Sequence, residues 1–600
     1  MFLTLLAALC TGIGYHFGFG NQTEALPIIE RFRDASFLKG DFFVDSGSEF
    51  GPRFYYAGLI ALLSRVASVP TVMLALAFLA NLGVAAVSHC AARDLLRADR
   101  LTGWVAATLS VCVSGFALGL VADLRFVDFQ PGSLAIPWAL AGLWLALLGK
   151  PIQAGLLSSI ALIWHPLYGL ETGALSLASA AVRALSSIKH WSLRSLFESL
   201  WPSALGGVIL GMAAVLLWAV PSHGASEPPL TTAEVVDILA RFRAPHHYLP
   251  STFPVSHYVA FLAFVLASAL TFRQFWLSEQ RQHRDLAFLV APVLILLGCL
   301  LGYLLVEVHP TQALATAQPF RLLYIFKWQG FLLAAWLIVR LWRSAGRARC
   351  YLALSAFAGT AAAQPGSFLL AALASGIEAR FGQRGLKFAQ WLTVGAALLT
   401  VPLVLLLGSR DELYLLGCAS VLLALFHGVR SPSRRSLAAF AFAALVIGLL
   451  ATNHALHFSR ARALSPVLSF DDHLGDDAEA ARWIRAQTSQ ASLFVIPPGL
   501  GSFRLIAQRN VVVDFKSLPF GATAMRSWYH RMLTLYGPVS AGGFAALRQM
   551  DQNYARISDA QLTRAAQEFG AAYALLYTST VTARTVVYRN STYQVVLLGL

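Results

Sequence analysis

Carboxylate side chains gather in two polar segments in the first quarter of the chain. The segment 20–53 and the segment 122–131 contain the candidate acids Glu24, Asp34, Asp41, Asp45, Asp123 and Asp128. A carboxylate can act as a general base for an attacking hydroxyl, and two together could hold Mg²⁺ or Mn²⁺. We take Glu24, Asp128, Asp41 and Asp45 as catalytic candidates, and Glu24 with Asp128 as the candidate metal pair. Solvated acidic loops are the alternative.

Basic and His side chains supply the complementary chemistry, because a departing anion needs positive charge beside it. The candidate substrate-binding residues are Asp34, Asp123, Arg125, His165, Arg241, His246, His247, Arg321 and Lys327. Each has a structural alternative: a solvated loop for the His pair, interfacial snorkelling for Arg321 and a satisfied helix break for His165. Lys327 is the hardest to dismiss, since a lysine within a membrane usually faces a cavity.

Motifs of soluble enzymes are missing from the sequence. It contains no P-loop, no dinucleotide-binding glycine pattern, no HExxH and no GxSxG. The six Cys form neither a CxxC motif nor a disulfide framework.

The composition predicts the class of protein to which these residues belong. Of the 600 residues, 57% are hydrophobic and only 12% are charged, about half the charge density of a soluble protein. This excludes a cytosolic enzyme and indicates a polytopic α-helical membrane protein. The net charge of +15 is typical of basic cytoplasmic loops, so we expect no nucleic-acid partner.

Basic clusters set the expected topology. We place on the cytoplasmic side the clusters at 93–100, 150, 183–194, 281–284, 343–349, 380–387 and 430–435. About 13–15 membrane segments follow, among them 388–407 and 436–452. Two hairpins of short helices, 152–185 and 350–378, are broken at His165-Pro166 and Gln364-Pro365-Gly366. The N-terminus would be cytoplasmic, and Phe54–Val66 would lie along the outer surface without spanning.

Three outer loops then contain most of the candidates: 20–53, 122–131 and 220–254. We expect the first two to converge over one cavity, with His246, His247 and Arg321 on its opposite wall. The stretch Glu24–Asp34 is amphipathic, and we expect its apolar side chains to meet the bilayer interface.

The composition changes near Asn453. We divide the chain into a multi-span domain, 1–452, and an extracytoplasmic α/β domain, 453–600. Helices are expected over 476–487, 522–536, 541–552 and 559–569, and strands over 493–496, 511–514, 572–577, 585–588 and 593–598. Charged residues flank the second strand, and they form either an ion-pair network or contacts to an acceptor or headgroup: Arg504, Arg509, Asp514 and Lys516.

This layout resembles the GT-C superfamily of membrane glycosyltransferases. The residues that carry the resemblance are Gly51-Pro-Arg-Phe-Tyr-Tyr, which enters the juxtamembrane helix, and Arg125-Phe-Val-Asp128-Phe-Gln-Pro131, which is similar to the family's Arg-x-Asp-x-Pro with longer gaps. The family often has Asp just after the first span, where this chain has Asn21-Gln-Thr-Glu24. Glu24 could serve there, with Asp34, Asp41 and Asp45 as rivals.

The resemblance implies an inverting glycosyltransferase of a bacterial inner membrane. It would transfer a sugar from a polyprenyl-phosphate donor to a lipid, glycan or protein acceptor at the periplasmic face, with the lipid bilayer and the lipid-linked donor as partners. A transporter or flippase without glycosyl transfer is the alternative, although transporters place their sites near the midplane. A non-catalytic assembly protein that works through 453–600 is the third possibility.

Overall fold

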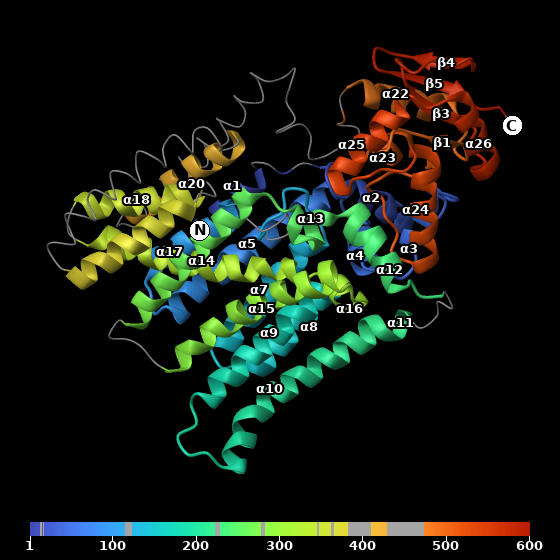
Figure 1. The fold of residues 1–600 in the computed structure, drawn as a ribbon. Helices are drawn as coiled ribbons and strands as arrows, with labels where there is room; N and C mark the ends of the chain where they lie inside the picture. Colours follow the sequence, from blue (N-terminus) through green and yellow to red (C-terminus); the bar gives the residue numbers. More distant parts are fainter. Residues whose placement is uncertain are drawn as a thin grey trace.

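The structure is a computed structural model that describes the chain except for residues 13–14, 16, 114–122, 223–227, 278–282, 345–346, 362–364, 382–409, 429–472, 474 and 600. A large helical part carries a smaller α/β part at one end (Figure 1). The segments expected at 388–407 and 436–452, the clusters at 384–387 and 430–435 and the expected domain boundary at 453 lie outside the described residues.

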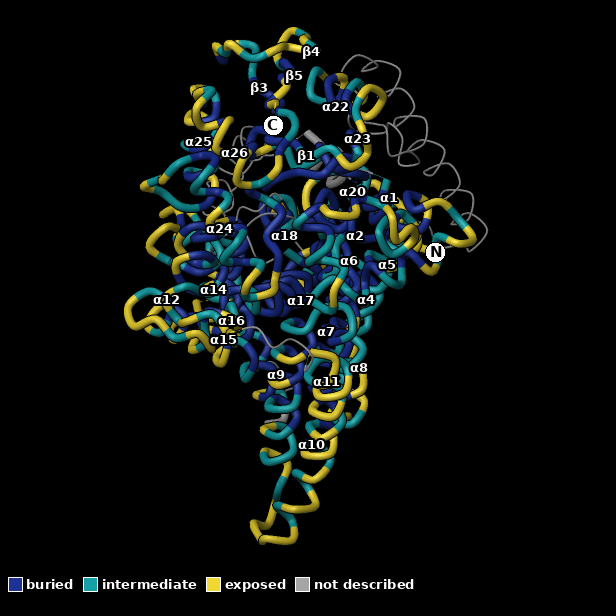
Figure 2. Tube along the Cα trace, turned by 90° about the vertical axis from the view of Figure 1, so that its right-hand side faces the viewer, coloured by how far each residue is buried: buried dark blue, intermediate teal, exposed yellow. Residues whose placement is uncertain are grey.

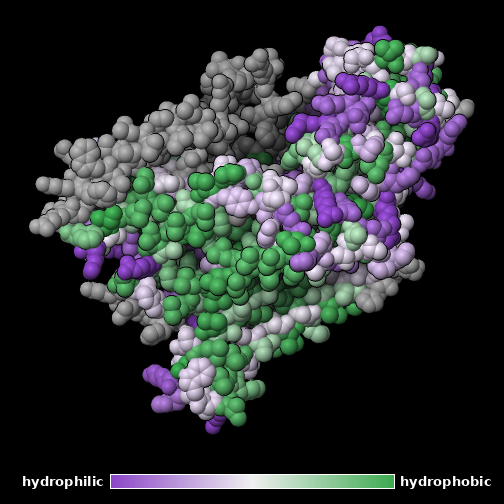
Figure 3. Space-filling model, in the orientation of Figure 1, coloured by the Kyte–Doolittle hydropathy of each residue, from purple (hydrophilic) through white to green (hydrophobic). Residues whose placement is uncertain are grey.

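The helical part has the size and apolarity of a membrane domain, which confirms the expected polytopic fold. Among the described residues, five helical stretches are long and apolar enough to span: Val69–Leu95, Leu193–Ser222, Val255–Trp276, Asp285–Val308 and Gln312–Arg343. Hydrophobic side chains cover this part, whereas hydrophilic ones gather on the α/β part (Figure 3). The count of 13–15 segments stays a prediction.

Shorter helices complete the helical part. They are α1 (Phe2–Gly12), α6 (Arg100–Cys112), α7 (Pro131–Leu147), α8 (Pro151–Trp164), α9 (Pro166–Leu185), α18 (Arg347–Ala361) and α20 (Arg410–Gly428). The expected break lies at His165, where α8 ends and α9 begins. Glycine lets α8 pack closely against the longer helix α10 (Leu193–Ala214), because a Cβ at Gly155 would overlap the Gly206 carbonyl oxygen.

The long helices differ in how much of their surface is covered. The helix α17 (Leu323–Arg343) is buried along most of its length at the centre. By contrast, α10 (Leu193–Ala214) continues through a π-helical turn, Val215–Ala219, into α11 (Val220–Ser222), and it is mostly exposed (Figure 2). The expected loop 220–254 is therefore shorter than predicted and partly helical, with α12 (Thr232–Val235), a π-helix (Val236–Arg243) and α13 (Pro245–Tyr248).

The first polar loop contains two short helices, α2 (Gln22–Arg33) and α3 (Phe42–Ser48), and α4 (Phe54–Leu63) follows it. At ten residues, α4 is too short to span. The expectation that α2 lies on the bilayer is wrong for part of its apolar face, because Leu26, Ile28 and Ile29 are fully buried. They belong to one apolar cluster with residues of α3, α4 and the α/β part.

The α/β part contains a five-stranded sheet in the order β2-β1-β3-β5-β4. The strands are β1 (Leu493–Val495), β2 (Asn510–Val511), β3 (Tyr573–Tyr577), β4 (Val586–Arg589) and β5 (Tyr593–Leu597). Its helices are α22 (Asp476–Gln487), α23 (Phe503–Ala507), α24 (Ala522–Tyr536), α25 (Gly543–Tyr554) and α26 (Asp559–Phe569). The strands β1, β2 and β3 are parallel to one another, and the β4–β5 hairpin is antiparallel.

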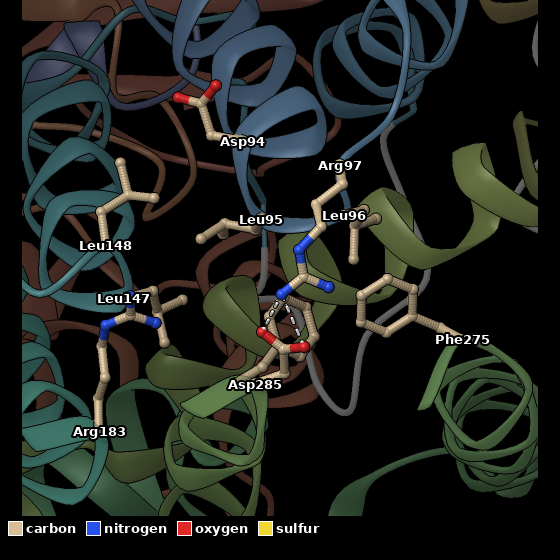
Figure 4. A pocket seen from close by; sticks show the side chains of 10 residues that line it. Asp94, Leu95, Leu96, Arg97, Leu147, Leu148, Arg183, Phe275 and Asp285 are labelled. Carbon is tan, nitrogen blue, oxygen red and sulfur yellow. Dashed lines mark hydrogen bonds and ion pairs between the residues drawn. The ribbon is translucent and has the colours of Figure 1, made fainter. Parts of the chain in front are cut away.

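Two of the basic clusters meet at one place. Arg97, beyond α5 (Val69–Leu95), and Arg183 of α9 line one pocket of about 70 Å³ (Figure 4). Asp285 lines it too and accepts hydrogen bonds from Arg97 Nη2 at 2.7 and 2.8 Å. The convergence agrees with placing these clusters on one side of the membrane.

Candidate active site

Glu24 lies in the first turn of α2, and its side chain is almost fully buried. One carboxylate oxygen forms an ion pair with Arg53, the N-cap residue of α4. The other, Oε1, lies 3.9 Å from Nη2 of Arg243. The short helices of the first loop thus bring Glu24 between two guanidinium groups.

Asp128 reaches the same region from the second polar loop. The backbone N–H of Asn21 donates to its Oδ2 at 2.6 Å, and Asn21 Nδ2 donates to Gln130 Oε1 at 2.7 Å. Gly20 makes this approach possible, since a Cβ there would lie 2.5 Å from Oδ2 and its φ is +58°. The loops 20–53 and 122–131 are therefore in contact, as expected, whereas a shared cavity with His246, His247 and Arg321 on its opposite wall stays a prediction.

The α/β part closes the site with Lys516. This ammonium interacts electrostatically with both Glu24 and Asp128. Arg243 Nη2 donates to the Lys516 carbonyl oxygen at 3.0 Å, and its guanidinium lies 5.1 Å from the centre of the Phe515 ring. Arg53 and Arg243 therefore face Glu24, and Lys516 interacts with both Glu24 and Asp128.

Burial changes the proton affinities in this cluster. Burial raises the pKa of the Asp128 carboxyl, while the hydrogen bond from Asn21 and the charge of Lys516 oppose the rise. Burial lowers the pKa of the Lys516 ammonium, and Glu24 and Asp128 oppose that change. Asp128 is thus a stronger proton acceptor than an ordinary aspartate.

The adjacent histidines are not the cations that the sequence suggested. Burial and the charge of Arg243 lower the pKa of His246 to about 4, and its ring stacks on Phe544 at 5.0 Å. Burial, followed by Arg321, His246 and Arg243, holds the pKa of His247 well below its usual value. Both rings are neutral at pH 7, so they can serve only as hydrogen-bonding groups there.

A second polar group surrounds Arg321. Its side chain hydrogen-bonds Gln318 and interacts electrostatically with Tyr168, Glu171 and His247. His165 caps α9 by accepting from the Tyr168 N–H at 3.5 Å. His247 interacts electrostatically with both Arg321 and Arg243. The polar group around Arg321 therefore adjoins the carboxylate cluster.

The remaining residues of the second loop face the helical core. Asp123 lies 3.7 Å from Nζ of the buried Lys327 of α17. Arg125 Nη1 donates to the Cys10 carbonyl oxygen at 3.0 Å. These contacts join the loop that bears Asp128 to α17 and α1.

Other candidate acids lie in different surroundings. Asp41 is fully buried and accepts hydrogen bonds from Arg504 Nε, the Val511 N–H and two N–H groups of α3. Asp45 pairs with Arg31 at 2.7 Å. Asp34 accepts from both the N–H and the hydroxyl of Ser36. These geometries favour structural roles over proton transfer.

The remaining basic candidates form ion pairs or hydrogen bonds outside the cluster of Glu24 and Asp128. Arg241 pairs with Asp237 at 2.7 Å and is largely exposed. Arg504 pairs with Asp41 and Asp514 in the core of the α/β part. Arg509 donates to backbone carbonyl oxygens, among them those of Arg485 and Thr488. The ion-pair interpretation of the charged tail segment therefore fits Arg504 and Asp514.

Glu24 and Asp128 do not fit a divalent metal ion. The oxygens of Glu24 face Arg53 and Arg243, and Lys516 faces both carboxylates. A Mg²⁺ or Mn²⁺ ion there would be repelled by three cations. Within the described part of the chain, no group of three or more His, Cys, Asp and Glu side chains could hold a metal.

Sequence reasoning missed two members of the cluster. Arg53 and Arg243 belong to the predicted loops 20–53 and 220–254, but neither is among the candidate residues. The signal available in the sequence is position: each arginine lies at one end of a short helix, Arg53 as the N-cap of α4 and Arg243 as the last residue of the π-helix Val236–Arg243. For Lys516 the sequence left two alternatives, an ion-pair network in the α/β part or a contact to the acceptor or a headgroup, and neither placed it beside Glu24 and Asp128.

Comparison with known proteins finds one family model and several solved structures that are similar to this chain. A domain of unknown function (DUF6798) matches residues 475–535. No curated protein matches. The chain is similar to the oligosaccharyltransferase AglB of Archaeoglobus fulgidus, solved with an inhibitory peptide and a dolichol-phosphate: the identity is 10%, the TM-score 0.43, and 96% of this chain and 69% of that one are covered.

The apo form of the Archaeoglobus fulgidus oligosaccharyltransferase gives 11% identity and a TM-score of 0.42 over the same shares of both chains. These matches agree with the resemblance expected from the sequence. At these TM-scores they assign neither an activity nor a residue to this chain.

Proposed function

We propose that this protein transfers a sugar from a lipid-linked phosphate donor to an acceptor on the extracytoplasmic side of the membrane. The observation that carries the proposal is the cluster of Glu24 and Asp128 with Arg53, Arg243 and Lys516. It lies where apolar helices meet a polar α/β part, so a lipid tail and a polar acceptor could both reach it.

Each side of the reaction has a matching group. The acceptor hydroxyl or amide attacks the anomeric carbon, and Asp128 takes its proton. The bond from that carbon to the phosphate oxygen breaks, and the departing anion is held by Arg53, Arg243 and Lys516. The raised pKa of Asp128 supports its role as the base, because a base works best with a pKa near the working pH.

Glu24 has a different role in this proposal. Its ion pair with Arg53 and its approach to Arg243 hold both guanidinium groups in place for the phosphate. If Glu24 were the base, its carboxylate would first have to leave Arg53. We therefore assign Glu24 to positioning.

A donor panel tests the proposal. Purified protein in proteoliposomes is given radiolabelled polyprenyl-phosphate and polyprenyl-pyrophosphate sugars with an extract of possible acceptors. The proposal expects release of the free lipid phosphate by the wild type, loss of release in Asp128→Asn, and normal release in Asp34→Asn. Movement of an intact lipid-linked sugar across the bilayer without its cleavage would support the transporter alternative instead.

A further inference from the structure

Two cysteines from distant parts of the chain meet inside the helical part. Cys10 of α1 and Cys112 of α6 are separated by 102 residues, yet their Sγ atoms lie 3.6 Å apart. Cys10 is fully buried and Cys112 is 5% exposed. Neither sulfur is close to a metal-binding group of His, Cys, Asp and Glu within the described residues.

We propose that Cys10 and Cys112 form a disulfide bond that joins α1 to α6. The sulfurs need to approach by about 1.5 Å to reach the bond length of a disulfide. Formation of the bond removes two protons and two electrons from the two thiols.

The oxidant is a protein disulfide of an extracytoplasmic thiol–disulfide exchange enzyme. One cysteine thiolate attacks a sulfur of that disulfide, the second displaces it from the mixed disulfide, and the oxidant leaves as a dithiol. Because both sulfurs are buried in the folded chain, the exchange takes place before α1 and α6 pack together.

The location favours oxidation. Cys10 is two residues from the end of α1, and Cys112 is the last residue of α6. Under the predicted topology these are the outer ends of both helices, and disulfides persist in extracytoplasmic compartments. The opposite end of α6 begins at Arg100, in a basic cluster of the predicted cytoplasmic side.

The disulfide bond would restrain the part of α1 that the second polar loop contacts. Arg125 of that loop donates to the Cys10 carbonyl oxygen at 3.0 Å, and Asp128 follows three residues later. Joining α1 to α6 therefore restrains the backbone against which this loop rests. The inference stands apart from the proposed function, since it concerns a covalent bond that exists with or without turnover.

Mass spectrometry of the full chain tests the proposal. Cells are alkylated before lysis, and the protein is purified without reductant and digested. We expect the peptides that contain Cys10 and Cys112 as one cross-linked species, which separates after reduction. Alkylation of both thiols in the non-reduced wild type would overturn the proposal, as would a bond from Cys112 to Cys418, whose thiol also acts electrostatically on Cys112.

Two cysteine variants test whether the cross-link depends on Cys10 specifically. Cys10→Ser should abolish the cross-link, whereas Cys90→Ser, in the basic half of α5, should leave it intact. Adding reductant should lower the melting temperature of the wild type and of Cys90→Ser but leave that of Cys10→Ser unchanged. A melting temperature that reductant does not move in any of the three proteins would also contradict the proposal.

Discussion

Asp128 and Glu24 carry the same functional group in different surroundings. Asp128 accepts a backbone hydrogen bond and has a pKa raised mainly by burial. Glu24 is paired with Arg53 and faces Arg243. Two nearby carboxylates whose environments differ in this way can divide the work, one moving a proton and one holding cations.

Asp128→Asn keeps the side-chain oxygen that accepts the Asn21 N–H but cannot accept the acceptor's proton. We expect sugar transfer to fall by about 10²–10⁴-fold, the usual cost of losing a general base, with normal expression and folding. Initial rates of lipid-phosphate release measure this. Asp34→Asn, which changes an exposed acid at the end of α2, is the control and should retain full activity.

The wild-type pH profile offers a second residue-scale prediction. Transfer needs ionised Asp128, and its pKa lies above the ordinary aspartate value. Activity should therefore fall with decreasing pH at a higher pH than an unperturbed Asp would give, about 3.9. A profile of kcat/KM against pH that stays flat down to that value would show that Asp128 is not the base.

Arg243→Gln should weaken donor binding more than it slows the bound complex. Removing a charged hydrogen-bonding group typically costs a factor of about 10–100 in affinity, so we expect KM for the donor to rise by that factor. Arg241→Gln is the matched control, because Arg241 lies two residues away and pairs with Asp237 in solvent. Equal effects of the two substitutions would argue against a phosphate site at Arg243.

At the scale of elements, the contact between α3 and the α/β part decides how Lys516 reaches the site. Asp41 at the N-cap of α3 pairs with Arg504 of α23, and both side chains are buried. Asp41→Asn leaves the Arg504 charge with one carboxylate fewer. Breaking a buried pair costs about 3–5 kcal/mol, so the melting temperature should fall.

Asp45→Asn is the control for that substitution. Asp45 pairs with Arg31 at a partly exposed position, where such pairs contribute about 0–1 kcal/mol. If thermal unfolding of the two variants shifted equally, the buried pair would not be what joins the two parts.

Local signals made many elements predictable. The bounds of α22, α24 and α26 agree with the expected 476–487, 522–536 and 559–569. In α26 the reason is visible, because Ser558 and Gln561 form a capping box and Gly570 ends the helix. The partner of α2 was not predictable, since an amphipathic face can meet lipid or protein equally well.

At the scale of the whole molecule, the cluster could be predicted only in part. Composition and loop position indicated Glu24 and Asp128, but Lys516 lies nearly 400 residues after Asp128. Similarly, 463 residues separate Asp41 from Arg504. A sequence shows that a charge is present, whereas its partner depends on how distant elements pack.

The predicted orientation places the α/β part outside the cytoplasm. An alkaline phosphatase fused after Leu600 should be active, and a green fluorescent protein fused there should be dark. The reverse pattern would put the cluster of Glu24 and Asp128 on the cytoplasmic side, where the proposed acceptor chemistry does not apply.

In the proposed function, Arg53, Arg243 and Lys516 hold a lipid-linked phosphate beside Asp128. The most direct test is a cryo-electron-microscopy map of the full chain in lipid with a non-hydrolysable phosphate-linked sugar donor. We expect phosphate density within hydrogen-bonding distance of Arg243 and Arg53, with the anomeric carbon facing Asp128. Donor density elsewhere in the molecule, with this cluster unchanged, would contradict it.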